Sequence, residues 1–415
     1  MVSGQWSVVS SQWSVNCKKG MLIIKEADLI CVNCGKNFEG TKVFRCPDCD
    51  SPLELLFGGH GIENKKTCST ERYHKFFPFE PREIVSMGEG NTPLVFVPRL
   101  AEKIGVKLLA IKNESMNPTW SFKDRGTSCC TTHAKALGFD HIGTVSSGNM
   151  AASVAAYGSY AGMKTTILVK ENLADEKLAP VAIYGSKLFR VKGNYDDVYY
   201  KSFELGRERG IYFMNSDVPF RVAGSRSISF EIAESFEFDV PEWIIVPTSA
   251  GGNIRGIISG FVTLMKFGYT SKTPRFICAQ AAGCSPIVTA FDKGEMKVVR
   301  FPNPDTIAHA IDNAFPPSGN ATLALLKKYD GFAIGVSEEA IISAQAEQAN
   351  NGLFGQPAAA VPIAAAYEAR ARGIINEKDR VVTIFTGSGL KYTAAFAHHK
   401  LSWNECHLNE LEKLI

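Results

Sequence analysis

The chain has 415 residues, of which 45% are hydrophobic and 21% are charged, which is enough apolar material for two globular domains and a small module. Its formal net charge is only +3, with lysine and arginine spread along the chain, so composition argues against nucleic acid or an anionic membrane as a partner. No apolar run approaches the roughly 18 residues that a membrane-spanning helix needs, and the N-terminus lacks the pattern of a secretory signal. We therefore expect a soluble, cytoplasmic protein.

The first segments differ in character from the rest of the chain. Residues 1–20 are rich in serine and show no helix or strand pattern, so we expect a flexible tail, and Met21 begins the first segment that reads as structured. Residues 21–58 contain two C-x2-C pairs, formed by Cys31, Cys34, Cys46 and Cys49. Two such turns supply four thiolates to one tetrahedral ion and leave no open position for catalysis, so we predict a structural zinc ribbon, with iron as the alternative metal. The other seven cysteines are scattered and are expected to be free thiols.

From about residue 84 onward, short apolar runs alternate with segments of helical length and spacing. The predicted strands are Leu108–Lys112, Ile142–Ser146, Thr165–Val169, Leu188–Val191, Tyr212–Asn215, Trp243–Pro247, Phe276–Ala279 and Val381–Phe385, and the predicted helices include Met150–Gly162, Val198–Arg209, Asn253–Met265 and Glu338–Asn350. This alternation predicts an α/β fold with open, mostly parallel twisted sheets flanked by helices. Ligands bind such sheets beyond the carboxyl ends of the strands.

The central motif is NPTWSFKDRG, residues 117–126. Ser121 is a plausible N-cap for a helix that begins near Phe122, which places Lys123 in the first helical turn at the mouth of the sheet. A single lysine at such a position is usually a solvated surface charge. Three further loops favour a different interpretation.

Each of these loops follows a predicted strand. The SSGN sequence at 146–149 offers backbone amides, Ser and Asn groups that suit an anion and a ring hydroxyl. The PTSAGGN sequence at 247–253 has paired glycines that let several N–H groups converge on a phosphate, and it matches neither the Walker motif nor the dinucleotide fingerprint. The TGSGLK sequence at 386–391 places a hydroxyl where it could meet a pyridine nitrogen. Together with Lys123, these loops indicate an aldehyde cofactor that carries a phosphate, pyridoxal 5'-phosphate.

In this order, the motifs resemble those of fold-type II pyridoxal-phosphate enzymes of the tryptophan synthase β-like superfamily, and among them the threonine synthase family. The resemblance runs from about residue 28 to about residue 395, and it includes GEGNTPL at residues 88–94. It implies a two-domain fold: a large cofactor-binding domain from residues 59–116 and 207–400, and a small α/β domain from residues 117–206. The ribbon precedes them, and residues 401–415 form a C-terminal tail.

The resemblance also implies a role for each site residue. Lys123 would bear the cofactor and act as the base that moves protons. The cofactor would also contact Asn149 through its ring oxygen, Thr386 through its pyridine nitrogen, and the phosphate-holding residues Ser249, Ala250, Gly251, Gly252 and Asn253. The implied substrate-binding residues are Ser147, Asn215, Ser216 and Arg221. Arg221 would be the principal charge for the substrate's own phosphate, a task that suits a planar guanidinium.

The implied activity is a lyase reaction of threonine biosynthesis, in which O-phospho-L-homoserine and water give L-threonine and phosphate by γ-elimination and β-addition. Trp120, Met150, Gln356 and Ser388 depart from the residues usual in the family and leave the exact substrate open. The alternatives are β-replacement on O-phosphoserine, as in a cysteate synthase, and a serine or threonine deaminase. A catalytically dead zinc-bearing interaction protein and a nucleic-acid-binding ribbon are the competing classes. Enzymes of this scaffold are often dimers, so the resemblance allows a homodimer.

Overall fold

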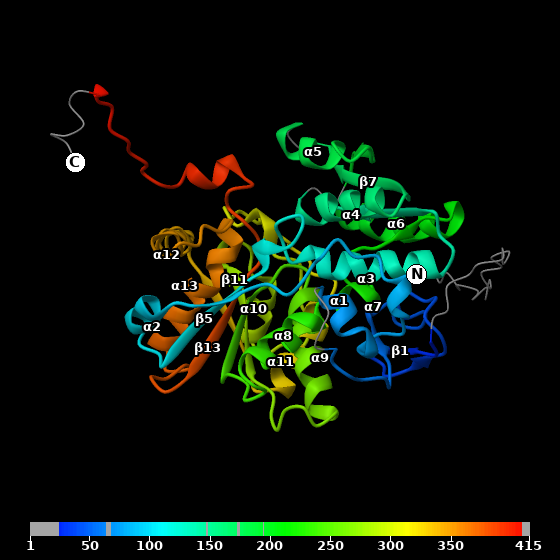
Figure 1. Cartoon of the computed structure of the whole chain (residues 1–415), viewed down its shortest axis with the longest axis horizontal. Coiled ribbons are helices and arrows are strands. Elements are labelled where there is room, and N and C mark those ends of the chain that lie inside the picture. Colours follow the sequence, from blue (N-terminus) through cyan, green and yellow to red (C-terminus); the bar gives the residue numbers. More distant parts are fainter. Residues whose placement is uncertain (1–24, 64–67, 147, 172–174, 194, 409–415) are drawn as a thin grey trace, which may run out of the picture.

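The computed structural model describes residues 25–63, 68–146, 148–171, 175–193 and 195–408 (Figure 1). The predicted N-terminal tail and Met21 therefore lie outside the described residues. In the ranges that the structure describes, no helix is both long and apolar enough to cross a membrane.

The N-terminal module is a small antiparallel sheet in the order β2-β1-β3. Its strands are β1 (Asp28–Cys31), β2 (Asn37–Phe38) and β3 (Leu53–Leu56). Leu29, Leu53 and Leu55 are buried and belong to the main hydrophobic core, so the module is packed onto the body of the protein. Three short strands bury too little surface to be stable alone, which agrees with the cross-linking ion that the cysteines predict.

The larger sheet has six strands in the order β12-β11-β10-β13-β5-β4, and all neighbours are parallel except the edge pair β4 and β5. The strands are β4 (Leu94–Phe96), β5 (Leu108–Asn113), β10 (Trp243–Pro247), β11 (Arg275–Ala281), β12 (Phe332–Val336) and β13 (Arg380–Phe385). Trp243 and Ile245 belong to one core cluster, Ile244 and Val246 to the other, so the sheet is buried on both faces. One face is covered by α2 (Pro98–Ile104), α12 (Glu338–Asn350) and α13 (Pro357–Ala371), and the other by α8 (Arg226–Ser235), α9 (Gly252–Lys266), α10 (Pro286–Asp292) and α11 (Gly319–Lys328).

The smaller sheet has four parallel strands in the order β8-β7-β6-β9. The strands are β6 (His141–Val145), β7 (Lys164–Lys170), β8 (Lys187–Val191) and β9 (Tyr212–Phe213), and the associated helices are α3 (Lys123–Ala136), α4 (Asn149–Tyr160), α5 (Asp175–Ala182), α6 (Tyr195–Arg209) and α7 (Pro219–Gly224). In Figure 1, α3 lies between α4 above and the helices of the larger sheet below, with the blue N-terminal module beside α7. The remaining short elements are α1 (Ser69–Arg72) and 3-10 turns at His74–Phe76, Pro81–Glu83, Glu114–Met116, Ala282–Cys284, His309–Ile311 and Thr393–Phe396.

The predicted α/β fold class is confirmed, and each predicted strand and helix is found within a few residues of its expected bounds. β4 and β12 were not among the predicted strands. The domain boundaries stay a prediction, although β9 pairs with β6 of the smaller sheet while the prediction placed residues from 207 onward in the large domain.

Candidate active site

The predicted lysine opens α3, because the helix begins at Lys123. The cap differs from the prediction: the residue before the helix is Phe122, and the buried Ser121 hydroxyl has no hydrogen-bond partner among the described residues. The reason is that this segment pairs with the loop after β13. The Phe122 amide donates to the Thr386 carbonyl at 3.1 Å, and the Ser388 amide donates to the Trp120 carbonyl at 3.2 Å. The loop after β13 is thereby fixed against the start of α3.

The Lys123 amine lies in an environment that favours its neutral form. Burial, with the positive charge of Arg221 as the smaller cause, lowers the pKa of Lys123 to about 7. The Lys123 Nζ lies 4.3 Å from the centroid of the Phe122 ring. A lysine that is about half neutral at pH 7 can act as a nucleophile and as a base.

Arg221 is brought next to Lys123 by the close packing of α3 and α7. A Cβ on Gly126 would lie 2.8 Å from the Arg221 carbonyl oxygen, and one on Gly224 would lie 2.5 Å from the Arg125 carbonyl oxygen, so only glycine permits this approach. The Arg221 side chain donates from Nε to the Met214 carbonyl at 2.9 Å. Its Nη2 is buried and has no partner within the described ranges, which leaves one edge of the guanidinium available to an anion.

The predicted phosphate loop joins β10 to α9. Gly251 has a φ of +90° and precedes the first residue of α9, so the loop turns back and the free N–H groups of the first helical turn are exposed to a ligand. Both polar atoms of the Asn253 amide are buried and lack a partner in the part of the chain that the structure describes. A Cβ on Gly252 would lie 2.4 Å from the Ser216 carbonyl oxygen. The phosphate loop and the predicted substrate segment are therefore in direct contact.

Asn149 opens α4 and forms a reciprocal amide pair with Gln356: its Nδ2 donates to Gln356 Oε1 at 3.0 Å, and its Oδ1 accepts from Gln356 Nε2 at 3.3 Å. A Cβ on Gly387 would lie 3.4 Å from Asn149 Nδ2, which places this pair beside the loop after β13. Lys391 from the same loop donates to the Thr119 carbonyl at 2.7 Å, and burial lowers its pKa to about 8. The sequence did not identify Gln356 or Lys391 as site residues, because their partners are far away in the chain.

The predicted substrate residues do not all have free side chains. Asn215 is fully buried; its Oδ1 accepts from the Val145 amide at 3.0 Å and its Nδ2 donates to Ser202 Oγ at 2.8 Å, so it joins β6 to the segment after β9. Ser216 Oγ lies 3.5 Å from the Tyr199 hydroxyl. Ser147 lies outside the described residues. The roles assigned to Ser147, Asn215 and Ser216 stay predictions.

The two residues after Lys123 take part in a buried polar network that the sequence did not indicate. Asp124 accepts hydrogen bonds from the Thr119 amide and hydroxyl, each at 2.6 Å, and from Ser153 Oγ at 2.6 Å. Arg125 forms ion pairs with Glu114 at 2.6 Å and with Glu231 at 2.7 Å, all buried. These bonds hold the first turn of α3 against the end of β5, against α4 and against α8.

The four predicted metal ligands come together in the N-terminal module. Their Sγ atoms all lie within 4.8 Å of one another, with Cys31 and Cys49 3.5 Å apart and Cys34 and Cys46 3.7 Å apart. Sulfurs around a tetrahedral zinc with Zn–S bonds of roughly 2.3 Å lie about 3.8 Å apart. The arrangement therefore fits the ion that the sequence predicts.

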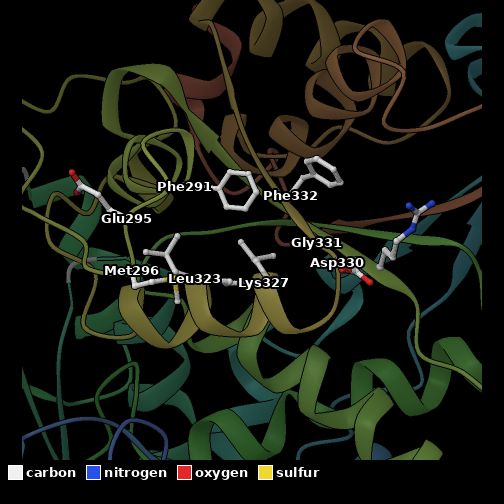
Figure 2. Close-up of a pocket in the computed structure, with 11 residues that line it drawn as sticks. Phe291, Glu295, Met296, Leu323, Lys327, Asp330, Gly331 and Phe332 are labelled. Atoms are coloured by element: carbon white, nitrogen blue, oxygen red, sulfur yellow. The ribbon is translucent and has the colours of Figure 1, made fainter.

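A surface pocket lies away from these loops, between α10, α11 and β12 (Figure 2). Phe291 and Phe332 lie above the helix that carries Leu323 and Lys327. Phe332 is the first residue of β12, so the pocket is at the amino ends of the parallel strands, opposite the edge from which the phosphate loop leaves. It contains none of the predicted site residues.

Comparisons with known proteins agree with the geometry. A family model described as "Pyridoxal-phosphate dependent enzyme" matches residues 85–387. The threonine synthase of Methanocaldococcus jannaschii is 36% identical over 93% of this chain and 98% of its own length, and that of Methanosarcina acetivorans is 37% identical over 88% of this chain and 92% of its own length. A structure of maize serine racemase superposes with a TM-score of 0.64 at 22% identity, covering 74% of this chain and 92% of that chain, and it shows the fold alone.

Proposed function

The chain belongs to the pyridoxal-phosphate-dependent enzymes and, within them, to the threonine synthase family, and we propose that it converts O-phospho-L-homoserine and water into L-threonine and phosphate. The observation that carries the proposal is the pairing of a half-buried amine of lowered pKa with an arginine whose outer edge is free. Arg221 is close enough to lower the pKa of Lys123, and its Nη2 has no partner in the described part of the chain. A phosphorylated amino acid needs both groups, whereas a simple deaminase substrate has no use for the second.

The residues present fit pyridoxal phosphate. The unsatisfied amide of Asn253, the positive φ of Gly251 and the free N–H groups that open α9 suit its phosphate. Lys123 supplies the amine for its aldehyde. Asn149 is proposed for its ring oxygen and Thr386 for its pyridine nitrogen, and both lie on loops that converge on the start of α3. When bound, the cofactor supplies an electron sink for carbanion chemistry at the substrate's Cα.

The chain's own residues then bind and protonate. Arg221 holds the substrate phosphate and neutralises its charge as that group departs from Cγ. Lys123 Nζ, about half neutral at pH 7, accepts the proton from Cα and returns protons to the product carbons. Water adds at Cβ, so substrate and water balance with threonine and phosphate. Asp124 and Arg125 hold α3 in place and do not reach the reacting atoms, because their polar groups are bonded within the protein.

We further propose that Cys31, Cys34, Cys46 and Cys49 hold a structural zinc, supported by the sulfur spacing. A cytoplasmic location is proposed because none of the ten cysteines of the described residues forms a disulfide, which is typical of a reducing compartment. A homodimer and the absence of a nucleic-acid partner stay predictions from the sequence.

The test is to incubate the purified holoenzyme with O-phospho-L-homoserine and to measure phosphate and threonine. We expect both products in equal amounts, and Arg221→Gln should raise KM strongly while the visible absorption of the lysine-bound cofactor is retained. Release of phosphate from O-phosphoserine in the presence of sulfite, or of ammonia from serine, would instead identify one of the alternative reactions. Release of neither product from O-phospho-L-homoserine would reject the proposal.

A further inference from the structure

We infer that the cysteine ribbon positions the substrate's anion site, and that Arg45 is the positioning residue through which it does so. This inference rests on the proposed role of Arg221 in binding the substrate phosphate. Arg45 directly precedes the predicted metal ligand Cys46. Its guanidinium forms an ion pair with Asp217, which lies 172 residues further along the chain in the segment that leads to Arg221.

The Arg45–Asp217 pair is well shielded from water. The side chain of Asp217 is fully buried and that of Arg45 is 12% exposed. Asp217 also accepts a hydrogen bond from the Tyr199 hydroxyl, while Arg45 donates to Asp50 Oδ1 at 2.8 Å and lies over the ring of Tyr200. Salt screening and the loss of side-chain entropy weaken ion pairs on the surface, but both effects are small for a buried pair. Removal of one partner would leave the other charge buried without compensation. Arg45 is therefore a fixed contact between the ribbon and the body of the protein.

Asp217 is placed where its position affects the anion site. It follows Ser216, whose carbonyl contacts Gly252 of the phosphate loop, and it precedes α7, in which Arg221 lies in the first turn. The backbone cannot shift toward either neighbour, because Gly252 and Gly126 already allow the closest approach that the packing permits. We therefore expect a displacement of Asp217 to move Ser216 and Arg221, two of the residues predicted to bind the substrate.

The ribbon contacts the body at other points as well: β3 packs against α7, and Arg255 of α9 donates to the Leu53 carbonyl at 3.4 Å. Arg226 donates to the Leu55 carbonyl at 2.8 Å, and Thr41 Oγ1 bonds His133 Nε2 at 2.9 Å. His133 lies on α3 and stacks against Phe220 of α7, and Arg226 opens α8. These contacts come from parts of the ribbon that are not adjacent to its metal ligands. Arg45 is the residue that joins a metal-ligand turn to the 215–221 segment, so metal binding and anion binding are coupled through it.

The matched variants are Arg45→Gln and Lys36→Gln. Lys36 follows the ligand Cys34 by two residues and forms an exposed ion pair with Asp48 inside the ribbon, so its loss removes a charge and a pair without touching the 215–221 segment. Both variants are prepared as holoenzyme, and their metal content is measured. The cofactor site is occupied, so that the binding of inorganic phosphate reports only on the substrate's anion site. Phosphate affinity is measured by calorimetry, and KM and kcat are measured with O-phospho-L-homoserine.

We expect Arg45→Gln to keep its metal and its cofactor absorption band while the Kd for phosphate and the KM rise together by roughly 3- to 30-fold, with kcat near the wild-type value. Lys36→Gln should behave as wild type. Removal of the metal from the wild-type holoenzyme with a chelator should weaken phosphate binding, and the same treatment of Arg45→Gln should add little. Equal phosphate affinity in the two variants, or no effect of metal removal, would overturn the inference.

Two further samples separate the ways in which the experiment can fail. If Arg45→Gln loses the cofactor band, the double variant Arg45→Gln/Asp217→Asn is measured in its place, because it removes both buried charges. Loss of the band in the double variant too would mean that the ribbon supports the whole fold. That result would overturn the inference. Arg221→Gln tests the anion site itself. If wild type and Arg221→Gln bind phosphate equally, the proposed function fails; if only Arg221→Gln is impaired, the site stands and the role of Arg45 fails.

Discussion

The lowered pKa of Lys123 makes the capture of the cofactor by the cofactor-free protein sensitive to pH in a predictable way. Only the neutral amine attacks an aldehyde. With a pKa of about 7, roughly three-quarters of the Lys123 side chains are neutral at pH 7.5, against about 0.1% for a lysine of ordinary pKa. Below the folded pKa the neutral fraction falls about tenfold per pH unit, and above it the fraction changes little. The capture rate should therefore rise to a plateau with a midpoint near pH 7.

The assay follows the visible band that appears when pyridoxal phosphate is added to the cofactor-free protein at a series of pH values. The same titration with a lysine model amide corrects for the ionisation of the aldehyde itself, and Lys123→Ala gives the baseline. Arg221→Gln removes the positive charge that is the smaller cause of the shift, so the midpoint should move to higher pH but stay below the ordinary lysine value, because burial remains. Arg226→Gln, a buried arginine that does not contribute to the shift, should leave the midpoint unchanged.

A midpoint above about pH 9 in the wild type would show that water reaches the amine and that burial does not set its pKa. A downward movement in Arg221→Gln would contradict the electrostatic reasoning, since loss of a neighbouring cation can only favour the protonated form. Either result would also remove the main support for Lys123 as a base at neutral pH.

Three further predictions concern the phosphate loop, the buried ion pairs and the ribbon. Asn253→Ala should weaken cofactor binding by roughly tenfold or more in equilibrium dialysis, because hydrogen bonds to a charged phosphate are strong; an unchanged Kd would place the phosphate elsewhere. Arg125→Met should lower the free energy of unfolding in urea by about 3–5 kcal/mol, because the buried carboxylates of Glu114 and Glu231 both lose the arginine and only Glu231 keeps another cation, Lys112; a loss under about 1 kcal/mol would show that water compensates them. Cys34→Ser should reduce bound zinc and lower Tm, and full zinc content in this variant would exclude Cys34 as a ligand.

The strands could be predicted from the sequence because most of them are covered on both faces and read as continuous apolar runs. Trp243–Pro247 and Glu338–Asn350 were predicted with the bounds that the structure has. β12 (FAIGV) was not predicted. It contains Gly335, which weakens its strand pattern, and β4 has only three residues, so its periodicity carries little information. Three of the predicted site loops follow strands of the larger sheet, β5, β10 and β13, and the carboxyl ends of parallel strands share one edge. The SSGN loop follows β6 of the smaller sheet, and the Asn149–Gln356 pair links it to the others.

What the sequence could not show are the contacts between charges far apart in the chain. Charged residues are ordinarily exposed, so Glu114, Arg125 and Glu231 gave no sign of being buried, and the pair of Arg125 with Glu231 spans 106 residues. The same holds for Arg45 and Asp217. Both side chains would be interpreted as surface charges, and only the folded arrangement reveals that they join a metal site to the substrate segment.

The structure gives the three charged residues of the lysine motif different roles. From the sequence, Lys-Asp-Arg looks like three reactive groups in a row, but successive helical residues point about 100° apart and cannot all face one ligand. In the structure, Lys123 has the lowered pKa. Asp124 accepts hydrogen bonds from the Thr119 amide and from Ser153 of α4, and Arg125 forms ion pairs that link α3 to the end of β5 and to α8. Because the amine must be held at a fixed place relative to the phosphate loop, the two charged neighbours serve catalysis by immobilising the first turn of α3. Their substitution should therefore change stability and cofactor retention together, whereas loss of Arg221 should weaken substrate binding and raise the pKa of Lys123.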